Sequence, residues 1–107
     1  MMLKPGIKLL EETQGVGRTA RKGETVEVRL NGWLNKGLQV QKDYVGTVKL
    51  GSRTVIPGIE YAIEGMKKGG KRRVEISPHL GYGEEGVKDL IPPNAVLIYE
   101  IELIEVS

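Results

Sequence analysis

The residues that could act as nucleophiles, acid–base catalysts or metal ligands are few in this chain. It contains a single histidine, His79, and no cysteine. No serine, carboxylate or second histidine stands at triad or metal-site spacing from His79, so we interpret it as a surface loop residue. Glu84 and Glu85 lie between glycines, which is typical of a solvated loop. The sequence therefore predicts no bound metal, no cofactor and no acid–base constellation.

A glycine-rich string surrounds Tyr82. Gly81, Gly83 and Gly86 satisfy the G-x-G-x-x-G pattern of a phosphate-binding turn. That chemistry requires a helix directly after the string, because the helix N-terminus receives the phosphate. No helical periodicity follows Gly86, so the pattern predicts an ordinary loop. What this segment does offer is the hydroxyl group of Tyr82, which can donate a hydrogen bond.

Length and charge limit the classes of function. The 107 residues predict one domain with a sizeable core, and 16 Lys+Arg against 14 Asp+Glu leave a net charge of only +2. So small a charge argues against nucleic acid as the main partner. The basic segment at residues 67–73 has no interleaved aromatic residues. We interpret it as a solvated turn at a helix end, with nucleic-acid binding as the weakest alternative.

Hydropathy gives an expectation for the compartment. No segment approaches the roughly 20 apolar residues of a membrane helix. The first residues lack the apolar stretch of about 7–15 residues at the centre of a signal peptide. We therefore expect a cytoplasmic monomer without a membrane partner.

Alternating apolar and polar residues predict several short strands. Residues 25–34 alternate with period two, and Gly37 supplies a hairpin turn after which Leu38 and Val40 resume the alternation. Further strands are expected at residues 45–50, 71–76 and 96–106. The last of these places four apolar side chains inward: Leu97, Tyr99, Ile101 and Leu103. Trp33 is expected to face away from Leu30 and Leu34.

Only one segment has helical spacing. Ile59, Ala62, Ile63 and Met66 form a single apolar stripe, Pro57 precedes it, and Gly69 follows as a stop. A helix of about ten residues with an internal Gly65 is too short to be stable alone, so it must pack on the sheet. The predicted fold class is α+β, a curved antiparallel sheet of about five strands wrapped around one short helix.

The order of these segments carries a family resemblance. Residues 55–76, VIPGIEYAIEGMKKGGKRRVEI, and residues 77–106, SPHLGYGEEGVKDLIPPNAVLIYEIELIEV, closely resemble the C-terminal half of the FKBP-type peptidyl-prolyl cis-trans isomerases. The match runs without a gap from Leu50 to Val106 and more loosely back to about Gly15. It implies a single FKBP-like domain over residues 1–107. Residues 1–14 would form an N-terminal extension and the first strand, and residues 15–107 match best.

The resemblance also implies a site between the helix and the concave face of the sheet. Its catalytic hydrogen-bond donors would be the hydroxyl of Tyr82 and the backbone N–H of Ile56. The substrate-binding slot would comprise Leu30, Val40, Gln41, Val55, Ile56, Ile59, Tyr82, Ile91 and Tyr99. Prolyl isomerisation needs no acid or base, because an apolar pocket favours the twisted amide, which has less charge separation than the planar one.

Several pocket positions depart from the family's usual residues. Leu30 stands where a tyrosine is usual, Val40 and Gln41 replace an aromatic residue and an aspartate, and Ile59 replaces a tryptophan. A further aromatic residue is missing near Gly46, and the loop between Val40 and Val48 is shorter than usual. We therefore expect isomerisation of X-Pro bonds in proline-containing polypeptides with reduced activity, and weak macrolide binding. The alternative is a non-catalytic peptide- or small-molecule-binding module on the same fold.

Overall fold

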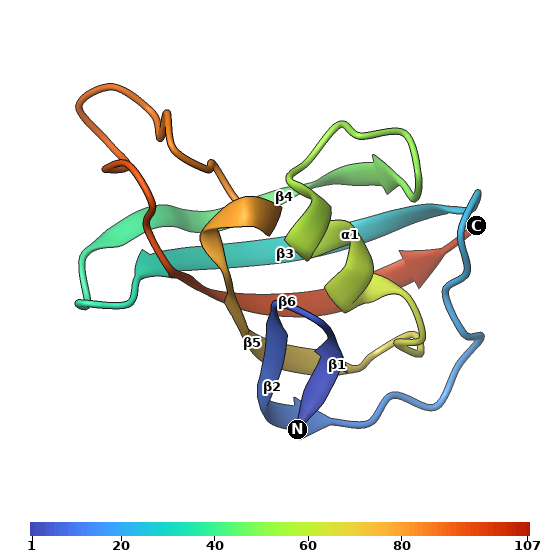
Figure 1. The fold of residues 1–107 in the computed structure, drawn as a ribbon. Helices are drawn as coiled ribbons and strands as arrows, with labels where there is room; N and C mark the ends of the chain where they lie inside the picture. The colour runs from blue at the N-terminus through green and yellow to red at the C-terminus, as the bar shows by residue number, and fades with distance from the viewer.

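A single antiparallel sheet of six strands curves around one helix, α1 (Pro57–Ile63), in the computed structural model, which describes residues 1–107 (Figure 1). The strands follow the order β1-β2-β5-β6-β3-β4 across the sheet. Their bounds are β1 (Met2–Lys4), β2 (Ile7–Thr13), β3 (Thr25–Leu34), β4 (Gln39–Lys49), β5 (Lys71–Ile76) and β6 (Leu97–Val106), with a 3₁₀ turn η1 at Pro78–Leu80. The α+β prediction is confirmed, with six strands instead of about five. The additional strand arises because the first 14 residues fold as a hairpin, β1 and β2, turned by Gly6 at φ +92°.

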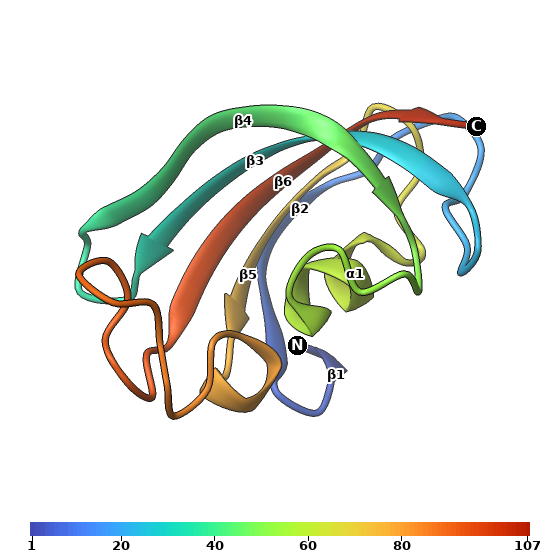
Figure 2. The ribbon, with the colours of Figure 1, turned by 90° about the horizontal axis from the view of Figure 1, so that it is seen from above.

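The concave face of the sheet and one face of α1 form the core. Every second residue of β6 from Leu97 to Leu103 is buried, as the alternation predicted, namely Leu97, Tyr99, Ile101 and Leu103. Ile59, Ala62 and Ile63 of α1 pack into the same cluster. Figure 2 shows α1 lying under the arch of the sheet, so the helix is stabilised by burial, not by its own length. With seven residues, α1 is far too short to cross a membrane, and no other segment of the structure could do so as a helix.

The helix is shorter than predicted because the chain leaves helical geometry at Glu64, which has ψ 129°, and Gly65 follows at φ +87°. Gly65 therefore lies outside the helix, not inside it, and ends it earlier than Gly69 would have done. Met66 is nevertheless buried, at 3 % exposure, because a turn after the helix carries it back into the core. Apolar spacing alone could not distinguish this turn from a continued helix.

The basic segment is less solvated than predicted. Arg72 is only 12 % exposed, and its Nε donates to a carboxylate oxygen of Glu12 on β2 at 2.7 Å. Its Nη1 donates to the carbonyl oxygens of Ala62 and Glu64 at 2.9 and 3.1 Å. Arg72 thus binds the free carbonyls at the end of α1 and ties the helix to the sheet.

Strand β4 corrects two expectations. The loop expected after Val40 joins the strand predicted at residues 45–50 in one continuous edge strand, β4. It contains a β-bulge, because β3 pairs Leu30 with Tyr44 but Gly32 with Gln41. Asp43 lies in the bulge at φ 46°, and its N–H donates to Oδ1 of Asn31 at 2.8 Å. Gly37 does turn the hairpin at φ +103°, but Leu38 is 63 % exposed and does not resume the inward alternation.

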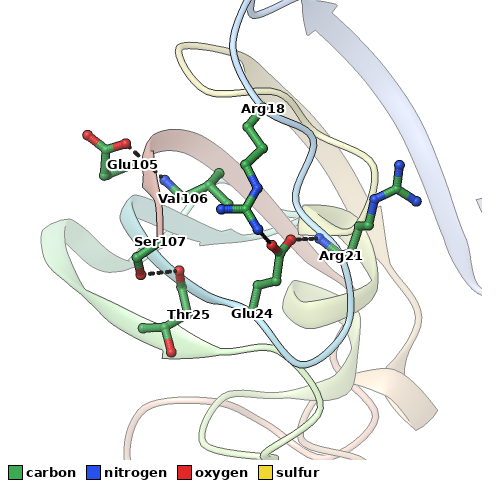
Figure 3. Close-up of polar contacts among 7 residues, drawn as sticks. All are labelled: Arg18, Arg21, Glu24, Thr25, Glu105, Val106 and Ser107. Carbon is green, nitrogen blue, oxygen red and sulfur yellow. Dashed lines mark hydrogen bonds and ion pairs between the residues drawn. The ribbon is translucent and has the colours of Figure 1, made fainter.

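The C-terminus is fastened at the end of the sheet far from the loop that contains Tyr82 (Figure 1). Figure 3 shows Ser107 donating its hydroxyl to the carbonyl oxygen of Thr25 at 2.9 Å. Next to it, Glu24 accepts from the backbone N–H of Arg21 at 2.7 Å and pairs with the guanidinium of Arg18. These contacts close the loop before β3 and leave the opposite end of the sheet free for a site.

Candidate active site

A cavity of about 290 Å³ opens between the start of α1 and the concave face of the sheet. Its volume is near the lower end of the range for small-molecule pockets, about 300–1,000 Å³. The walls come from four parts of the chain: strand β3, strand β4, the loop with the first helical turn, and the loop after η1. The lining residues are Leu30, Gln41, Tyr44, Thr54, Val55, Ile56, Ile59 and Tyr82.

Six of the nine predicted site residues line this cavity. They are Leu30, Gln41, Val55, Ile56, Ile59 and Tyr82. The other three lie outside its wall: Ile91 is buried in the core, Val40 packs against the core, and Tyr99 is 2 % exposed. Tyr99 still reaches the site indirectly, because its hydroxyl donates to Oε1 of Gln41 at 2.9 Å.

Sequence reasoning missed two lining residues, Tyr44 and Thr54. Strict alternation would place Gln41 and Tyr44 on opposite faces of β4, since they are three residues apart. The extra residue of the bulge returns both side chains to the concave face. Aspartate tolerates a left-handed backbone better than most residues, so Asp43 was the one sequence signal that could have indicated the bulge.

The loop before α1 is held by a side chain of the helix itself. Glu60 is only 7 % exposed, and its Oε2 accepts hydrogen bonds from the backbone N–H groups of Gly51 at 3.2 Å and Arg53 at 3.1 Å. Both partners precede the lining residues Thr54, Val55 and Ile56. The buried carboxylate therefore fixes the wall of the cavity that this loop forms.

Both hydrogen-bond donors that the family resemblance implies have no partner within the protein. One is the backbone N–H of Ile56, whose carbonyl already accepts from the N–H of Ile59 at 3.0 Å. The other is the hydroxyl of Tyr82, a residue 36 % exposed. The loop of Tyr82 is shaped by two bonds, Gly83 N–H to Pro78 O at 2.9 Å and Gly86 N–H to Tyr82 O at 3.0 Å. Both donors are available to a bound molecule.

Burial raises the pKa of the Tyr99 hydroxyl well above its usual value, and the neighbouring Tyr82 adds to the rise. Tyr99 therefore remains a neutral donor to Gln41 at physiological pH. The cavity wall carries no carboxylate, histidine or lysine. No three His, Cys, Asp or Glu side chains gather anywhere in the structure as a metal site would require. What the site can do chemically is exclude water from a bound group and donate hydrogen bonds to it.

Comparison with known proteins identifies the family. The family model for FKBP-type peptidyl-prolyl cis-trans isomerases matches residues 16–104. The chain belongs to this family. It is 39 % identical to an FK506-binding protein of Neisseria meningitidis serogroup A, over 94 % of this chain and 97 % of that one. The predicted family and its prolyl isomerase activity are confirmed.

Solved structures of FKBP-type proteins share the fold over nearly the whole chain. The crystal structure of AtFKBP13 superposes with a TM-score of 0.88 at 30 % identity, covering 99 % of this chain and 97 % of that one. A peptidyl-prolyl cis-trans isomerase from Pseudomonas syringae pv. tomato is 38 % identical, with a TM-score of 0.80 and coverage of 97 % and 83 %. The chain is thus an FKBP-type isomerase that acts on proline-containing peptides.

A second hollow of this FKBP-type domain has the wrong chemistry for a proline ring. It measures about 260 Å³, and its lining includes only one hydrophobic residue, Ile101. The charged residues around it include the exposed cross-strand pair Arg29 and Glu102, with 3.4 Å between nitrogen and oxygen. Four basic and four acidic side chains balance there: Arg29, Lys71, Arg72, Arg73, Glu11, Glu12, Glu100 and Glu102. The apolar cavity remains the candidate active site.

Proposed function

We propose that prolyl isomerisation takes place in the cavity between α1 and the sheet. The proline ring would lie against Leu30, Val55, Ile56 and Ile59, and the carbonyls of the bound chain would accept from the Tyr82 hydroxyl and the Ile56 N–H. One observation carries this proposal: an apolar cavity and two unpaired donors occur together. The other three predicted site residues would support the cavity walls by packing in the core behind them: Val40, Ile91 and Tyr99.

The reaction follows from the physics of the amide. Rotation about the bond before proline is slow because resonance must be lost, and resonance places negative charge on the carbonyl oxygen. Water stabilises that charge in the planar form. A cavity that removes water from the carbonyl therefore favours the twisted form, while donors to the neighbouring peptide hold the substrate in position. No proton is transferred at any step.

We propose that this activity is lower than is usual for the family and that macrolide binding is weak. The lining is aliphatic at Leu30, Val55 and Ile59. An aromatic side chain buries about 150–250 Å² and offers a rigid surface, so its replacement by a branched aliphatic residue makes a slot with less shape selectivity. Tyr44 on β4 provides part of the missing aromatic surface.

A protease-coupled assay on a blocked tetrapeptide with a Leu-Pro bond tests the proposal. We expect micromolar protein to accelerate the isomerisation, which takes about 10–100 s without catalysis. Tyr82→Phe should lower kcat/KM about three- to tenfold, the effect of one lost hydrogen bond. Tyr61→Phe is the matched control, because Tyr61 is 37 % exposed on α1 and does not line the cavity. A wild-type protein without measurable acceleration would contradict the proposal.

The aliphatic lining supports a second candidate, a module that binds peptides or small molecules but no longer catalyses. NMR distinguishes the two functions. Catalysis exchanges the cis and trans resonances of a bound prolyl peptide, whereas binding alone shifts the protein resonances and leaves the two peptide isomers unexchanged. We expect exchange for the wild-type protein.

A further inference from the structure

The side chain of Gln41 is oriented by a buried partner. The hydroxyl of Tyr99 donates to Oε1 of Gln41 at 2.9 Å, and it has no other partner in the protein. If the amide were reversed, Nε2 would face the phenol oxygen, and the hydroxyl proton would have no acceptor. A buried donor without a partner costs free energy, so the observed orientation is favoured. The amide nitrogen of Gln41 is thereby directed away from Tyr99.

Two further features fix this arrangement. The ring of Tyr99 lies directly on Gly32, where a β-carbon would come within 2.4 Å of Cζ, so the ring has one position. The backbone of Gln41 is held by the bulge, since the Asp43 N–H donates to Asn31 Oδ1 at 2.8 Å and Gln39 Nε2 donates to the Gln41 carbonyl at 3.1 Å. Gln41 is therefore constrained at both its amide and its main chain.

The amide nitrogen of Gln41 is a free donor at the cavity. Gln41 lines the cavity, and its Nε2 makes no hydrogen bond within the protein. The Ile56 N–H and the hydroxyls of Tyr82 and Tyr44 are also unpaired there, and the lining contains no carboxylate. Such a lining suits a ligand that presents backbone carbonyls.

We propose that the Gln41 amide, oriented by Tyr99, donates a hydrogen bond to a backbone carbonyl of the bound X-Pro peptide and so determines the affinity of the site for peptides. This inference rests on the proposed function of the cavity. Gln41 acts as a substrate-binding residue, and Tyr99 acts through Gln41 as a positioning residue. The bond forms with the ground state and the twisted state alike, so it sets KM more than kcat.

Substitutions that remove the donor test the proposal in the peptide assay. Gln41→Leu removes the amide, and we expect KM to rise about three- to tenfold with kcat changed less than twofold. Tyr99→Phe should raise KM by a smaller factor, because the amide can then rotate. The double variant should match Gln41→Leu alone, since Tyr99 has nothing left to orient. Additive effects of the two substitutions would overturn the positioning role of Tyr99.

Gln41→Glu gives a readout that a purely structural role would not move. A carboxylate cannot donate, so KM should rise about tenfold at pH 8 and fall again only toward pH 4, where a glutamate with a reference pKa of about 4.3 is protonated. The KM of the wild-type protein should stay constant over this range, measured by NMR exchange without protease. Lys42→Gln changes the net charge equally on the adjacent, exposed position and should leave KM unchanged. A pH-independent KM in Gln41→Glu would overturn the inference.

The outcomes separate this inference from the function on which it rests. Active wild-type protein together with Gln41→Leu and Gln41→Glu variants of unchanged KM would overturn only the role of Gln41. Peptide binding without catalysis would overturn the isomerase site. The Gln41 donor would then be tested by the loss of affinity in the same variants and by a shift of its side-chain NH₂ resonances on titration. A protein that neither binds nor isomerises the peptide would overturn both.

Discussion

Tyr44 lies across Gly46, so closely that a β-carbon on Gly46 would come within 2.5 Å of the Tyr44 hydroxyl oxygen. The two residues are two positions apart on β4 and therefore share its concave face. Tyr99 lies on Gly32 in the same manner, with 2.4 Å from the β-carbon position to Cζ. At both places a glycine makes the room that a tyrosine ring occupies. The aromatic residue that is missing near Gly46 is thus replaced by the ring of its neighbour Tyr44.

Gly46→Ala should therefore change activity more than stability. The added methyl group must displace the Tyr44 ring, which is 46 % exposed and can move at little cost. We expect kcat/KM to fall about two- to fivefold, as in Tyr44→Ala, with the free energy of unfolding changed by less than about 1 kcal/mol. The double variant should equal either single one. A Gly46→Ala protein with unchanged kcat/KM would show that Tyr44 does not contribute to the site.

Glu60 should be required for the loop that carries Thr54, Val55 and Ile56. Glu60→Ala removes the acceptor of two backbone N–H groups and should lower the free energy of unfolding by about 2–4 kcal/mol. Glu60→Gln retains an acceptor oxygen and should lose less. Chemical denaturation measures the stability, and hydrogen exchange at Gly51 and Arg53 reports the loop directly. Glu85→Ala is the control, because Glu85 is exposed and its removal breaks no hydrogen bond. Unaltered hydrogen exchange at the Gly51 amide in Glu60→Ala would contradict the role of Glu60 in holding the loop.

The sequence predicted regular structure well wherever burial imposed a period. Strands β3 and β5 begin and end at the predicted residues, and the inward set of β6 is correct. The helix and β4 were less well predicted, because their deviations depend on local backbone conformations: Glu64 at ψ 129° followed by Gly65 at φ +87°, and Asp43 at φ 46°. A prediction from hydrophobic periodicity assumes that every residue has regular helix or strand geometry. At these two places the backbone does not.

The site shows the same division. Leu30, Val55, Ile56, Ile59 and Tyr82 line the cavity as the family resemblance implied. Tyr44 could not be found, because its direction depends on the bulge, and the bulge depends on contacts between β3 and β4. The link from Tyr99 to Gln41 spans 58 residues along the chain. Neither local pattern nor propensity carries information about such a contact.

Arg72 should be a major contributor to stability. Arg72→Met keeps the apolar stem but removes the bonds to the carbonyls of Ala62 and Glu64, and it leaves Glu12 with only the hydrogen bond from Gln14. We expect the free energy of unfolding to fall by about 2–3 kcal/mol in urea denaturation. Arg73→Met is the matched control: its ion pairs are 3.9 Å long and solvent-exposed, so the change should be within about 0.5 kcal/mol. Equal losses in the two variants would contradict this role of Arg72.

Ile59→Trp should raise activity by returning an aromatic floor to the cavity. Ile59 lines the cavity and is 3 % exposed, so the larger ring must extend into the open space. We expect kcat/KM on the Leu-Pro peptide to rise about two- to tenfold, with a loss of about 1–3 kcal/mol in stability from overpacking. Leu10→Trp adds the same ring on β2, at the far side of the sheet, and should not change kcat/KM. Reduced activity in a folded Ile59→Trp protein would mean that the cavity is already filled as far as catalysis permits.

Alkaline pH should destabilise the protein through Tyr99. In the unfolded chain a tyrosine ionises near pH 10, whereas burial and the neighbouring Tyr82 raise the pKa of Tyr99 in the folded protein. The folded state therefore retains a proton that the unfolded state releases. The stability that this group contributes is present in full below about pH 10 and is lost as the pH rises toward the folded pKa, at about 1.4 kcal/mol per pH unit.

Comparison with Tyr99→Phe isolates this contribution from that of the lysines. At pH 8 the wild-type protein should be more stable by about 1 kcal/mol, the value of the hydrogen bond to Gln41. Between pH 10 and 11 the difference should shrink and then change sign, because phenylalanine has no proton to lose. Urea denaturation at pH 8, 9, 10 and 11 measures both proteins, with Tyr61→Phe as the exposed control. Curves that remain parallel for wild type and Tyr99→Phe would mean that the phenol of Tyr99 ionises in the folded protein as easily as in the unfolded one, and that its hydroxyl is not the buried donor that orients Gln41.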